Sequence, residues 1–203
     1  MIFQTNSVAL LKISKVISNV FNPLTSLFLF FVYESSRKYT VTETIVNFIP
    51  IMLITIIPIT IWISWNVKKG RYTNMDVSNR NQRKSLYFFI AGMLLIYLMY
   101  NYVIHQEIDY TMTFLLLLLL VLQISNYLIK SSMHTAFNVF VAALFFNLNP
   151  YLGCIWLGIA VAVGITRIIL KRHTLQEVLT GAFIALLVSF IYLYTNIQMQ
   201  TYL

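Results

Sequence analysis

The chain has 203 residues, of which 59% are hydrophobic and only 10% are charged, and its mean hydropathy is +0.78. A soluble domain of this length does not carry that much apolar surface, so the composition excludes a soluble globular protein and predicts a single integral membrane domain over residues 1–203. The net charge of +8 does not indicate a nucleic-acid partner, because the basic residues lie between apolar segments and not on one polar surface.

Seven apolar segments reach or approach the length of about 20 residues that a helix needs to cross the hydrocarbon of a bilayer. They predict an all-α fold, a polytopic transmembrane bundle with about seven spans at residues 16–33, 45–65, 86–103, 111–129, 133–148, 151–170 and 175–194. Pro23 suits the first turn of a helix or a kink, and Asn149 with Pro150 predicts a turn. The segment 66–85 is too charged to cross a membrane and forms a basic loop.

Basic residues concentrate on one side of this predicted topology. With seven spans, the second, fourth and sixth connections share a face with the N-terminus. That face carries 12 of the 14 basic residues, namely Lys12, Lys15, Lys68, Lys69, Arg71, Arg80, Arg83, Lys84, Lys130, Arg167, Lys171 and Arg172. Because Lys and Arg are enriched in cytoplasmic loops, the charge bias predicts that this face is cytoplasmic.

Residues 166–177 (TRIILKRHTLQE) hold the densest group of reactive side chains. If a helix begins at Thr174, His173 stands at its start and Glu177 lies one turn inside, so the imidazole and the carboxylate can face each other. A carboxylate bound to one ring nitrogen leaves the lone pair of the other nitrogen free to attack phosphorus. Arg167 can hold phosphate oxygens. Two other interpretations stay open, a plain capping box of Thr174 with Glu177 and a set of interfacial anchors formed by Arg167, Lys171 and Arg172.

Two further polar clusters fall on the same predicted face. Ser132 precedes His134 at the start of a predicted helix, where free N–H groups and the helix dipole attract an anion. A plain N-cap explains this serine equally well. The basic loop contains DVSNRNQRK at 76–84, which fits a phosphate-binding loop, a topology signal or a lipid-headgroup patch. His105 lies on the opposite face and is interpreted as an interfacial polar residue.

These three clusters, in this order, resemble the three signature motifs of the type 2 phosphatidic acid phosphatase superfamily, which includes membrane lipid phosphate phosphatases and vanadium haloperoxidases. The family's third motif is serine, arginine, five residues, histidine, three residues and aspartate. Thr166, Arg167, His173 and Glu177 match its spacing throughout. The second motif is proline, serine, glycine, histidine, and residues 131–134 read SSMH, which keeps the serine and the histidine.

The family's first motif is lysine, six residues, arginine and proline. Asp76, six residues, Arg83 and Lys84 occupy this frame, so the arginine is kept while the lysine and the proline are not. Arg80 or Lys84 would compensate for Asp76. Met133 stands where the family has a glycine whose missing side chain lets the backbone approach phosphate closely. The resemblance covers the chain from about the second predicted span to the end.

The resemblance implies a helical phosphatase core and a role for each matched residue. His173 would attack the phosphorus and carry a phosphohistidine intermediate, which Glu177 would orient. His134 would protonate the leaving oxygen and then activate water. The implied substrate-binding residues are Arg83, Ser132, Met133 through its backbone N–H, Arg167, Lys84 and Arg80. The reaction would need no metal ion and no other cofactor.

The expected function is therefore hydrolysis of a phosphomonoester or diphosphate on an amphipathic lipid, such as phosphatidate, phosphatidylglycerol phosphate or polyprenyl diphosphate. The alternative is a catalytically impaired member of the family that binds lipid phosphates or acts as a membrane scaffold, which Asp76 and Met133 favour. We expect an integral protein of a bacterial plasma membrane with its site on the N-terminal face. The charge bias puts this face in the cytoplasm, whereas bacterial members of the family commonly carry the site outside.

Overall fold

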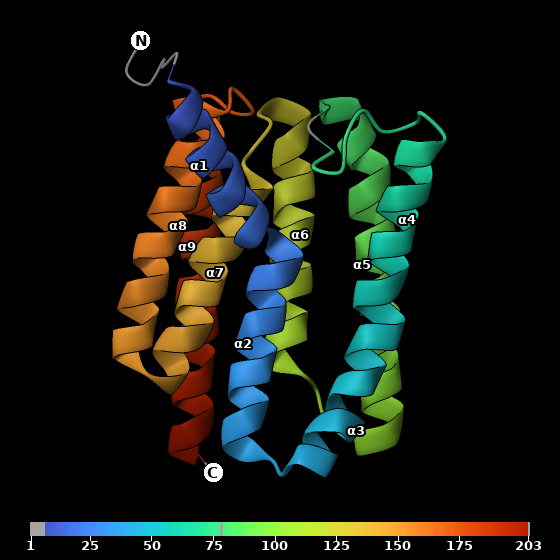
Figure 1. Cartoon of the computed structure of the whole chain (residues 1–203). Helices are drawn as coiled ribbons and strands as arrows, with labels where there is room; N and C mark the ends of the chain where they lie inside the picture. The colour runs from blue at the N-terminus through green and yellow to red at the C-terminus, as the bar shows by residue number, and fades with distance from the viewer. Residues whose placement is uncertain (1–6, 78, 203) are drawn as a thin grey trace. The chain divides into compact units, whose positions relative to one another are not determined.

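The computed structural model describes residues 7–77 and 79–202, which form helices and connecting loops without any strand (Figure 1). The all-α prediction is therefore confirmed for this part of the chain. In chain order the helices are α1 (Val8–Val20), α2 (Pro23–Lys38), α3 (Val41–Ile51), the π-helix η1 (Met52–Ile56), α4 (Ile57–Lys68), α5 (Arg80–His105), α6 (Tyr110–Leu128), α7 (Met133–Leu148), α8 (Pro150–Ile169) and α9 (Leu175–Tyr202). Ser78, in the basic loop, lies outside the described residues.

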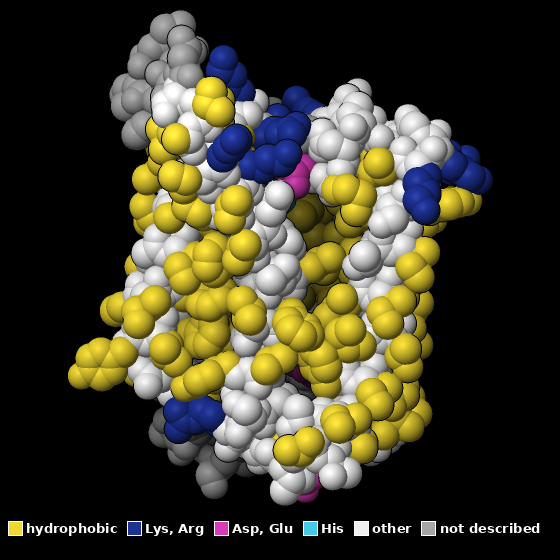
Figure 2. Space-filling view, viewed as in Figure 1, with side chains coloured by type: hydrophobic (Ala, Val, Ile, Leu, Met, Phe, Trp, Pro, Cys, Tyr) yellow, Lys and Arg dark blue, Asp and Glu magenta, His cyan; other side chains and the backbone are white. Residues whose placement is uncertain are grey.

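Five helical segments among the described residues are long and apolar enough to cross a membrane: Val41–Lys68, Arg80–His105, Tyr110–Leu128, Pro150–Ile169 and Leu175–Gln198. The α1–α2 pair, bent by 52°, makes a sixth only if it is one broken span, and the 16-residue α7 is apolar but shorter. Figure 2 shows hydrophobic side chains along the outer faces of the helices and Lys and Arg near the helix ends, as expected for lipid-facing helices. These are the features of an integral membrane protein, and the count of seven spans is not confirmed.

The predicted span at 16–33 is not one helix, because the chain breaks between α1 and α2. The side chain of Asn22 accepts hydrogen bonds from the backbone N–H of Leu24 at 3.0 Å and of Thr25 at 3.1 Å, and so caps α2. Pro23 is the first residue of α2, where its missing N–H costs nothing. An Asn-Pro pair therefore ends one helix and begins the next inside an apolar stretch.

The contacts of the chain divide into two compact units, unit 1 (Met1–Glu34 and Leu128–Leu203) and unit 2 (Ser35–Tyr127). Unit 1 is built around α7, whose residues from Met133 to Phe145 are all buried. In this unit α7 packs against α8 and α9, and α1 packs against α8 (Figure 1). A helix that is apolar on all sides and enclosed by other helices does not face lipid, which explains why α7 need not match the thickness of a bilayer. The prediction of one membrane domain stays a prediction.

Asn138 links the helices of unit 1 through four hydrogen bonds. Its side-chain amide donates to the backbone carbonyl of Phe21, at the end of α1, at 2.9 Å and to that of His134 at 2.8 Å. Its side-chain oxygen accepts from the hydroxyl of Ser26 at 2.9 Å and from the indole of Trp156 at 3.3 Å. Asn138 is fully buried and uses both donors and both lone pairs of its amide. The bond to Phe21 satisfies a carbonyl that has no helical partner at the α1–α2 break, within an apolar interior.

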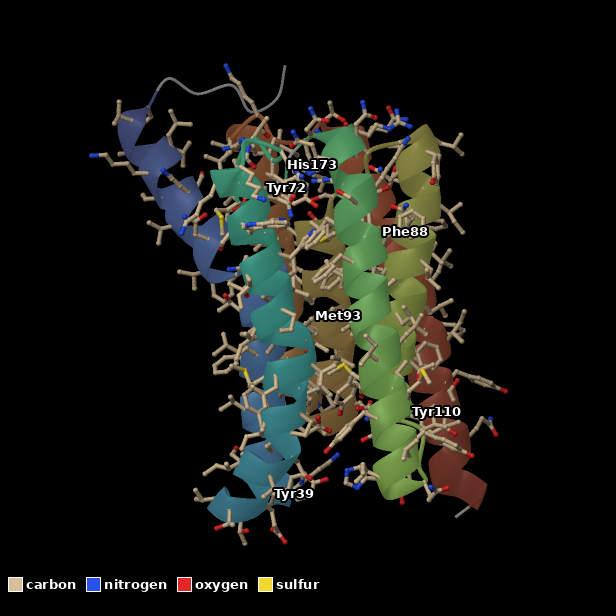
Figure 3. All side chains as sticks on the ribbon, turned by 90° about the vertical axis from the view of Figure 1, so that its right-hand side faces the viewer. Tyr39, Tyr72, Phe88, Met93, Tyr110 and His173 are labelled. Atoms are coloured by element: carbon tan, nitrogen blue, oxygen red, sulfur yellow. The ribbon has the colours of Figure 1, made fainter. Side chains whose placement is uncertain are left out.

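Unit 2 contains the continuous α3–η1–α4 segment, α5 and α6. Pro58, just inside α4, lacks an N–H group and crowds the preceding turn, which accounts for the widened π-helical turn before it. The basic loop between α4 and α5 is anchored by Tyr72, whose hydroxyl contacts the indole of Trp62 at 3.2 Å and the hydroxyl of Ser85 at 2.9 Å. Figure 3 shows Tyr72 at the end of unit 2 opposite Tyr39.

Replacing Asn138 by alanine should destabilise unit 1. The change leaves the carbonyl of Phe21, a hydroxyl and an indole N–H without their partner on α7, and an unsatisfied buried group costs about 1–3 kcal/mol. After local relaxation we expect Asn138→Ala to lower the free energy of unfolding by about 2–4 kcal/mol. Thermal unfolding of the detergent-solubilised protein measures this. Asn147→Ala, on the exposed face of the same helix, is the control and should have little effect; equal unfolding midpoints for the two variants would contradict the role of Asn138.

Candidate functional site

His173 and Glu177 contact each other at the start of α9. The Nδ1 atom of His173 lies 2.8 Å from Oε2 of Glu177, and the imidazole is 0% exposed while the carboxylate side chain is 19% exposed. An ionised carboxylate accepts here, so Nδ1 carries the proton and Nε2 keeps its lone pair. The expectation that the two side chains face each other is confirmed. The pair has the arrangement of a nucleophile with an orienting acid.

The same carboxylate also caps α9. Oε2 of Glu177 accepts from the backbone N–H of Thr174 at 3.1 Å, and the backbone N–H of Glu177 donates to the hydroxyl of Thr174 at 3.2 Å. These two bonds form a capping box. The capping interpretation is therefore also confirmed, and it does not compete with the contact to His173. Because the cap fixes the Glu177 side chain, it also fixes the position from which the carboxylate holds the imidazole.

The turn from α8 to α9 places His173 by backbone hydrogen bonds. Lys171 has a left-handed backbone with φ 54°, and its N–H donates to the carbonyl of Ile168 at 2.9 Å. The N–H of Arg172 donates to the carbonyl of Arg167 at 3.0 Å, so α8 ends in a Schellman motif. The N–H of His173 donates to the same carbonyl of Arg167 at 3.2 Å. The backbone of the predicted nucleophile is thereby fixed one turn beyond the last helical residues of α8.

Arg167 is completely buried and points toward α1. Its guanidinium donates to the hydroxyl of Ser18 at 2.8 Å, and both side chains are at most 1% exposed. The interfacial-anchor interpretation of Arg167 is wrong, because an anchor keeps its charged group in the headgroup region. Sequence reasoning missed Ser18. The available signal was their spacing, because Ser14 and Ser18 lie four residues apart and are the buried residues of α1.

The start of α7 is joined to the start of α9. Ser132 is the N-cap of α7, and its hydroxyl accepts from the N–H of Thr135 at 3.4 Å and from the hydroxyl of Thr135 at 3.0 Å. The N–H of Ser132 donates to the backbone carbonyl of Glu177 at 2.9 Å. The N-cap interpretation of Ser132 is confirmed. Met133 and His134, both buried, follow directly in the first turn of α7. A phosphate contact to these residues stays a prediction.

Two glycines allow this close approach of helices. A Cβ atom on Gly181 of α9 would lie 2.7 Å from the carbonyl oxygen and 3.0 Å from the nitrogen of Ser132. A Cβ atom on Gly164 of α8 would lie 3.0 Å from a methyl group of Val178 and 3.6 Å from Thr135. Small residues at helix contacts are the usual means of close packing in membranes. Here they bring the backbone of α9 against the N-cap of α7.

Lys130, on the loop before α7, completes the described polar cluster of unit 1. Its ammonium group donates to the carbonyl of Arg172 at 3.0 Å and lies 3.7 Å from Oε2 of Glu177. Sequence reasoning counted Lys130 only as a topology charge. The missed signal was its place directly before the SSMH segment. The two loops that carry the predicted histidines are therefore connected by a lysine as well as by the Ser132 backbone.

The basic residues of the first predicted motif lie in unit 2 and contact other parts of that unit. Arg83 is 1% exposed, and its Nε donates to the carbonyl of Val77 at 3.0 Å. Arg80 donates from Nε to the carbonyl of Asn126 at 2.6 Å and from Nη2 to the carbonyl of Tyr127, so it caps the C-terminal end of α6. Their predicted contacts with phosphate stay predictions.

Lys84 and Asp76 belong to the same basic segment. The ammonium group of Lys84 lies 5.1 Å from the centre of the Tyr127 ring, a cation–π distance. Asp76 is partly buried in the loop before α5. The structure thus gathers the predicted residues from the second and third motifs within unit 1, and those from the first motif within unit 2. Among the described residues, no group of three or more His, Cys, Asp or Glu side chains is arranged to hold a metal ion.

Comparison with family models, with curated proteins and with solved structures found no match to this chain. The similarity to the phosphatase superfamily therefore rests on the residues and spacing of the three motifs. Its consequences for activity are a proposal, developed below.

The contact between α9 and the N-cap of α7 can be tested by adding one carbon atom. Gly181→Ala puts a Cβ into the backbone of Ser132, so α9 must shift and the bond from Ser132 to Glu177 must lengthen. We expect a loss of about 1–3 kcal/mol in the free energy of unfolding. Gly158→Ala is the control, because nothing lies within 4 Å of its added Cβ, and it should be neutral or stabilising by up to about 1 kcal/mol. Thermal unfolding that ranks the two variants in the opposite order would contradict this packing.

Proposed function

We propose that this chain is a membrane lipid phosphate phosphatase of the type 2 phosphatidic acid phosphatase superfamily. The observation that carries the proposal is the contact of His173 Nδ1 with Glu177 at 2.8 Å, beside the start of α7 and the end of α8. A carboxylate bound to one ring nitrogen orients the imidazole and makes the ring more basic, which is how histidine nucleophiles are activated. The spacing of Arg167, His173 and Glu177 supports the same assignment.

The reaction proceeds in two steps. Nε2 of His173 attacks the phosphorus while the bond from phosphorus to the lipid oxygen breaks, and His134 gives its proton to that oxygen. The products of this step are the dephosphorylated lipid and a phosphohistidine. His134, now neutral, takes a proton from water, whose oxygen attacks the phosphorus and releases inorganic phosphate. Glu177 stabilises the positive charge on the imidazole of His173 in both steps.

Positive groups around the phosphorus stabilise the transition state. In unit 1 these are the guanidinium of Arg167 and the first N–H groups of α7, including that of Met133 after the Ser132 cap. The resemblance also assigns Arg83, Lys84 and Arg80 of unit 2 to phosphate binding, and this assignment is part of the proposal. Catalysis of this kind relies on positioning and charge and needs no metal ion.

The substrate is an amphipathic lipid phosphate that reaches the site from the bilayer. Phosphatidate, phosphatidylglycerol phosphate and polyprenyl diphosphate all carry the required terminal phosphoryl group. The seven-span topology, with α7 as the fifth span, puts the site on the N-terminal face. The positive charge of that face favours the cytoplasmic side of a bacterial plasma membrane.

A second function is binding of lipid phosphates without turnover, or a scaffold role in the membrane. Two observations favour it. Arg80 donates to two carbonyls at the end of α6, so its donors are used within unit 2. The side chain of Met133 is buried directly beside the N-cap of α7, where the family's glycine leaves room for phosphate.

Purified full-length protein in lipid nanodiscs should release inorganic phosphate from at least one of the three lipid classes with a chelator present. His173→Ala should abolish the release, because it removes the nucleophile. Glu177→Gln should lower kcat by about 100-fold or more, because the amide no longer fixes and balances the imidazole. Colorimetric phosphate determination provides the rates.

The matched control is His105→Ala, a histidine on an exposed helix end, which should keep full activity. Absence of phosphate release from every lipid, together with saturable binding of the same lipids that His173→Ala weakens, would favour the binding function. Equal rates in the unmodified protein and in His173→Ala would exclude the proposed mechanism.

A further inference from the structure

Lys130 connects three parts of the predicted catalytic cluster. Its side chain is 22% exposed, so most of the side chain is covered by protein. It reaches the carbonyl of Arg172 on the α8–α9 turn at 3.0 Å and the carboxylate of Glu177 on α9 at 3.7 Å. Its own backbone lies on the loop that leads into the Ser132 cap of α7. Neither the motif comparison nor the mechanism above uses this residue.

We propose that Lys130 is a positioning residue that holds Glu177 against His173 and locks the α8–α9 turn to the loop before α7. The catalytic consequence of this contact rests on the proposed phosphatase function. The contact itself does not, and it can be measured in a protein without activity.

The replacement of aspartate by glutamate in the third motif makes such a residue necessary. Glu177 has one more rotatable bond than aspartate, so its carboxylate has more orientations and loses more side-chain entropy when it faces His173. Two further donors restrict it: the Thr174 N–H at 3.1 Å and the Lys130 ammonium at 3.7 Å lie near the same oxygen that His173 uses. The longer acid is thus held in one place by groups outside the motif.

Lys130 also affects the charge of the imidazole. Its Nζ lies within about 6.5 Å of Nδ1 of His173, because the two atoms are 3.7 and 2.8 Å from one carboxylate oxygen. A positive charge at this range disfavours protonation of the ring and keeps the nucleophile neutral. The charged and titratable groups on the segments around His173 are Lys130, His134, Arg167, Lys171, Arg172 and Glu177.

A direct phosphate contact is the competing role, since the first motif has Asp76 in place of a lysine. The observed geometry favours positioning, because the ammonium group already lies near a carbonyl and a carboxylate of the protein. The two roles differ in kinetics. A phosphate ligand that binds substrate and transition state alike changes KM, whereas a residue acting through Glu177 changes kcat.

The first experiment is a double-mutant cycle in the phosphate-release assay. Lys130→Met should lower kcat by about 10- to 100-fold with KM within about twofold, since small displacements of a catalytic group have effects of this size. In a Glu177→Gln background the same change should cause less than about a threefold further loss, because the residue it acts through is gone. Lys130→Arg should recover most of the rate. Lys171→Met, an exposed lysine of the same turn, is the charge-matched control and should keep kcat.

The second experiment does not depend on activity. The chain has 3 histidines, so nitrogen-15 labelling of histidine in the micellar protein gives three ring systems, and His173→Gln assigns one of them. Lys130→Met should move the titration midpoint of the His173 ring to higher pH by about 0.5 to 1 unit, and Lys171→Met by less. The unmodified protein should carry its ring proton on Nδ1 of His173.

The outcomes separate the two proposals. Absence of phosphatase activity together with the expected shift at His173 would end the proposed function and keep the positioning role of Lys130. An active protein in which Lys130→Met changes neither kcat nor the titration midpoint would overturn the inference. A rise in KM alone, or an equal loss with and without Glu177, would also overturn it and assign Lys130 to the phosphate.

Discussion

The backbone hydrogen bond from Ser132 to the carbonyl of Glu177, at 2.9 Å, is the constraint on which the candidate site depends. It joins the N-terminal ends of α7 and α9, so two positive dipole ends lie side by side. Two such ends repel each other unless negative charge lies between them. The carboxylate of Glu177 supplies part of this charge, and a bound phosphate would supply more. The arrangement therefore favours an anion for electrostatic reasons that do not depend on any family resemblance.

The packing of unit 1 keeps this pair of helix ends in place. Gly181 allows the backbone of α9 to reach Ser132, and Asn138, one turn after His134, ties the start of α7 to the end of α1 and to α8. In an apolar interior each backbone group needs a partner within the protein, and the α1–α2 break opens one at Phe21. The side-chain amide of Asn138 thus satisfies the carbonyl at the α1–α2 break and also anchors the helix that carries His134. Structural and functional demands meet on α7, which explains why it is buried along most of its length.

Hydropathy and local chemistry predicted most of the helices, the turn at Asn149 and Pro150, and the facing of His173 and Glu177, because each depends on residues close in sequence. The spacing of four residues between His173 and Glu177 was sufficient to predict that these two side chains face each other. The break after α1 was not predicted, since apolar content alone does not distinguish a kink from a capped helix end. The contacts of Ser18 with Arg167 and of Asn138 with Ser26 join residues more than 100 positions apart. Hydrophobic periodicity does not predict such pairs, nor does it predict the hydrogen bonds of Tyr72 that anchor the basic loop.

At the start of α9, the capping box and the proposed catalytic pair share one carboxylate. Thr174 and Glu177 form the box, and the carboxylate that closes it is the one that binds His173. Glu177→Ala therefore removes a helix cap and an orienting acid together, whereas Glu177→Gln can keep the cap and removes only the charge. Lys130 touches the same carboxylate without belonging to the cap, so it separates the two contributions. From the sequence alone, a capping box and an orienting acid are alternative explanations of Glu177. In the structure, the capping box fixes the carboxylate that contacts the imidazole of His173.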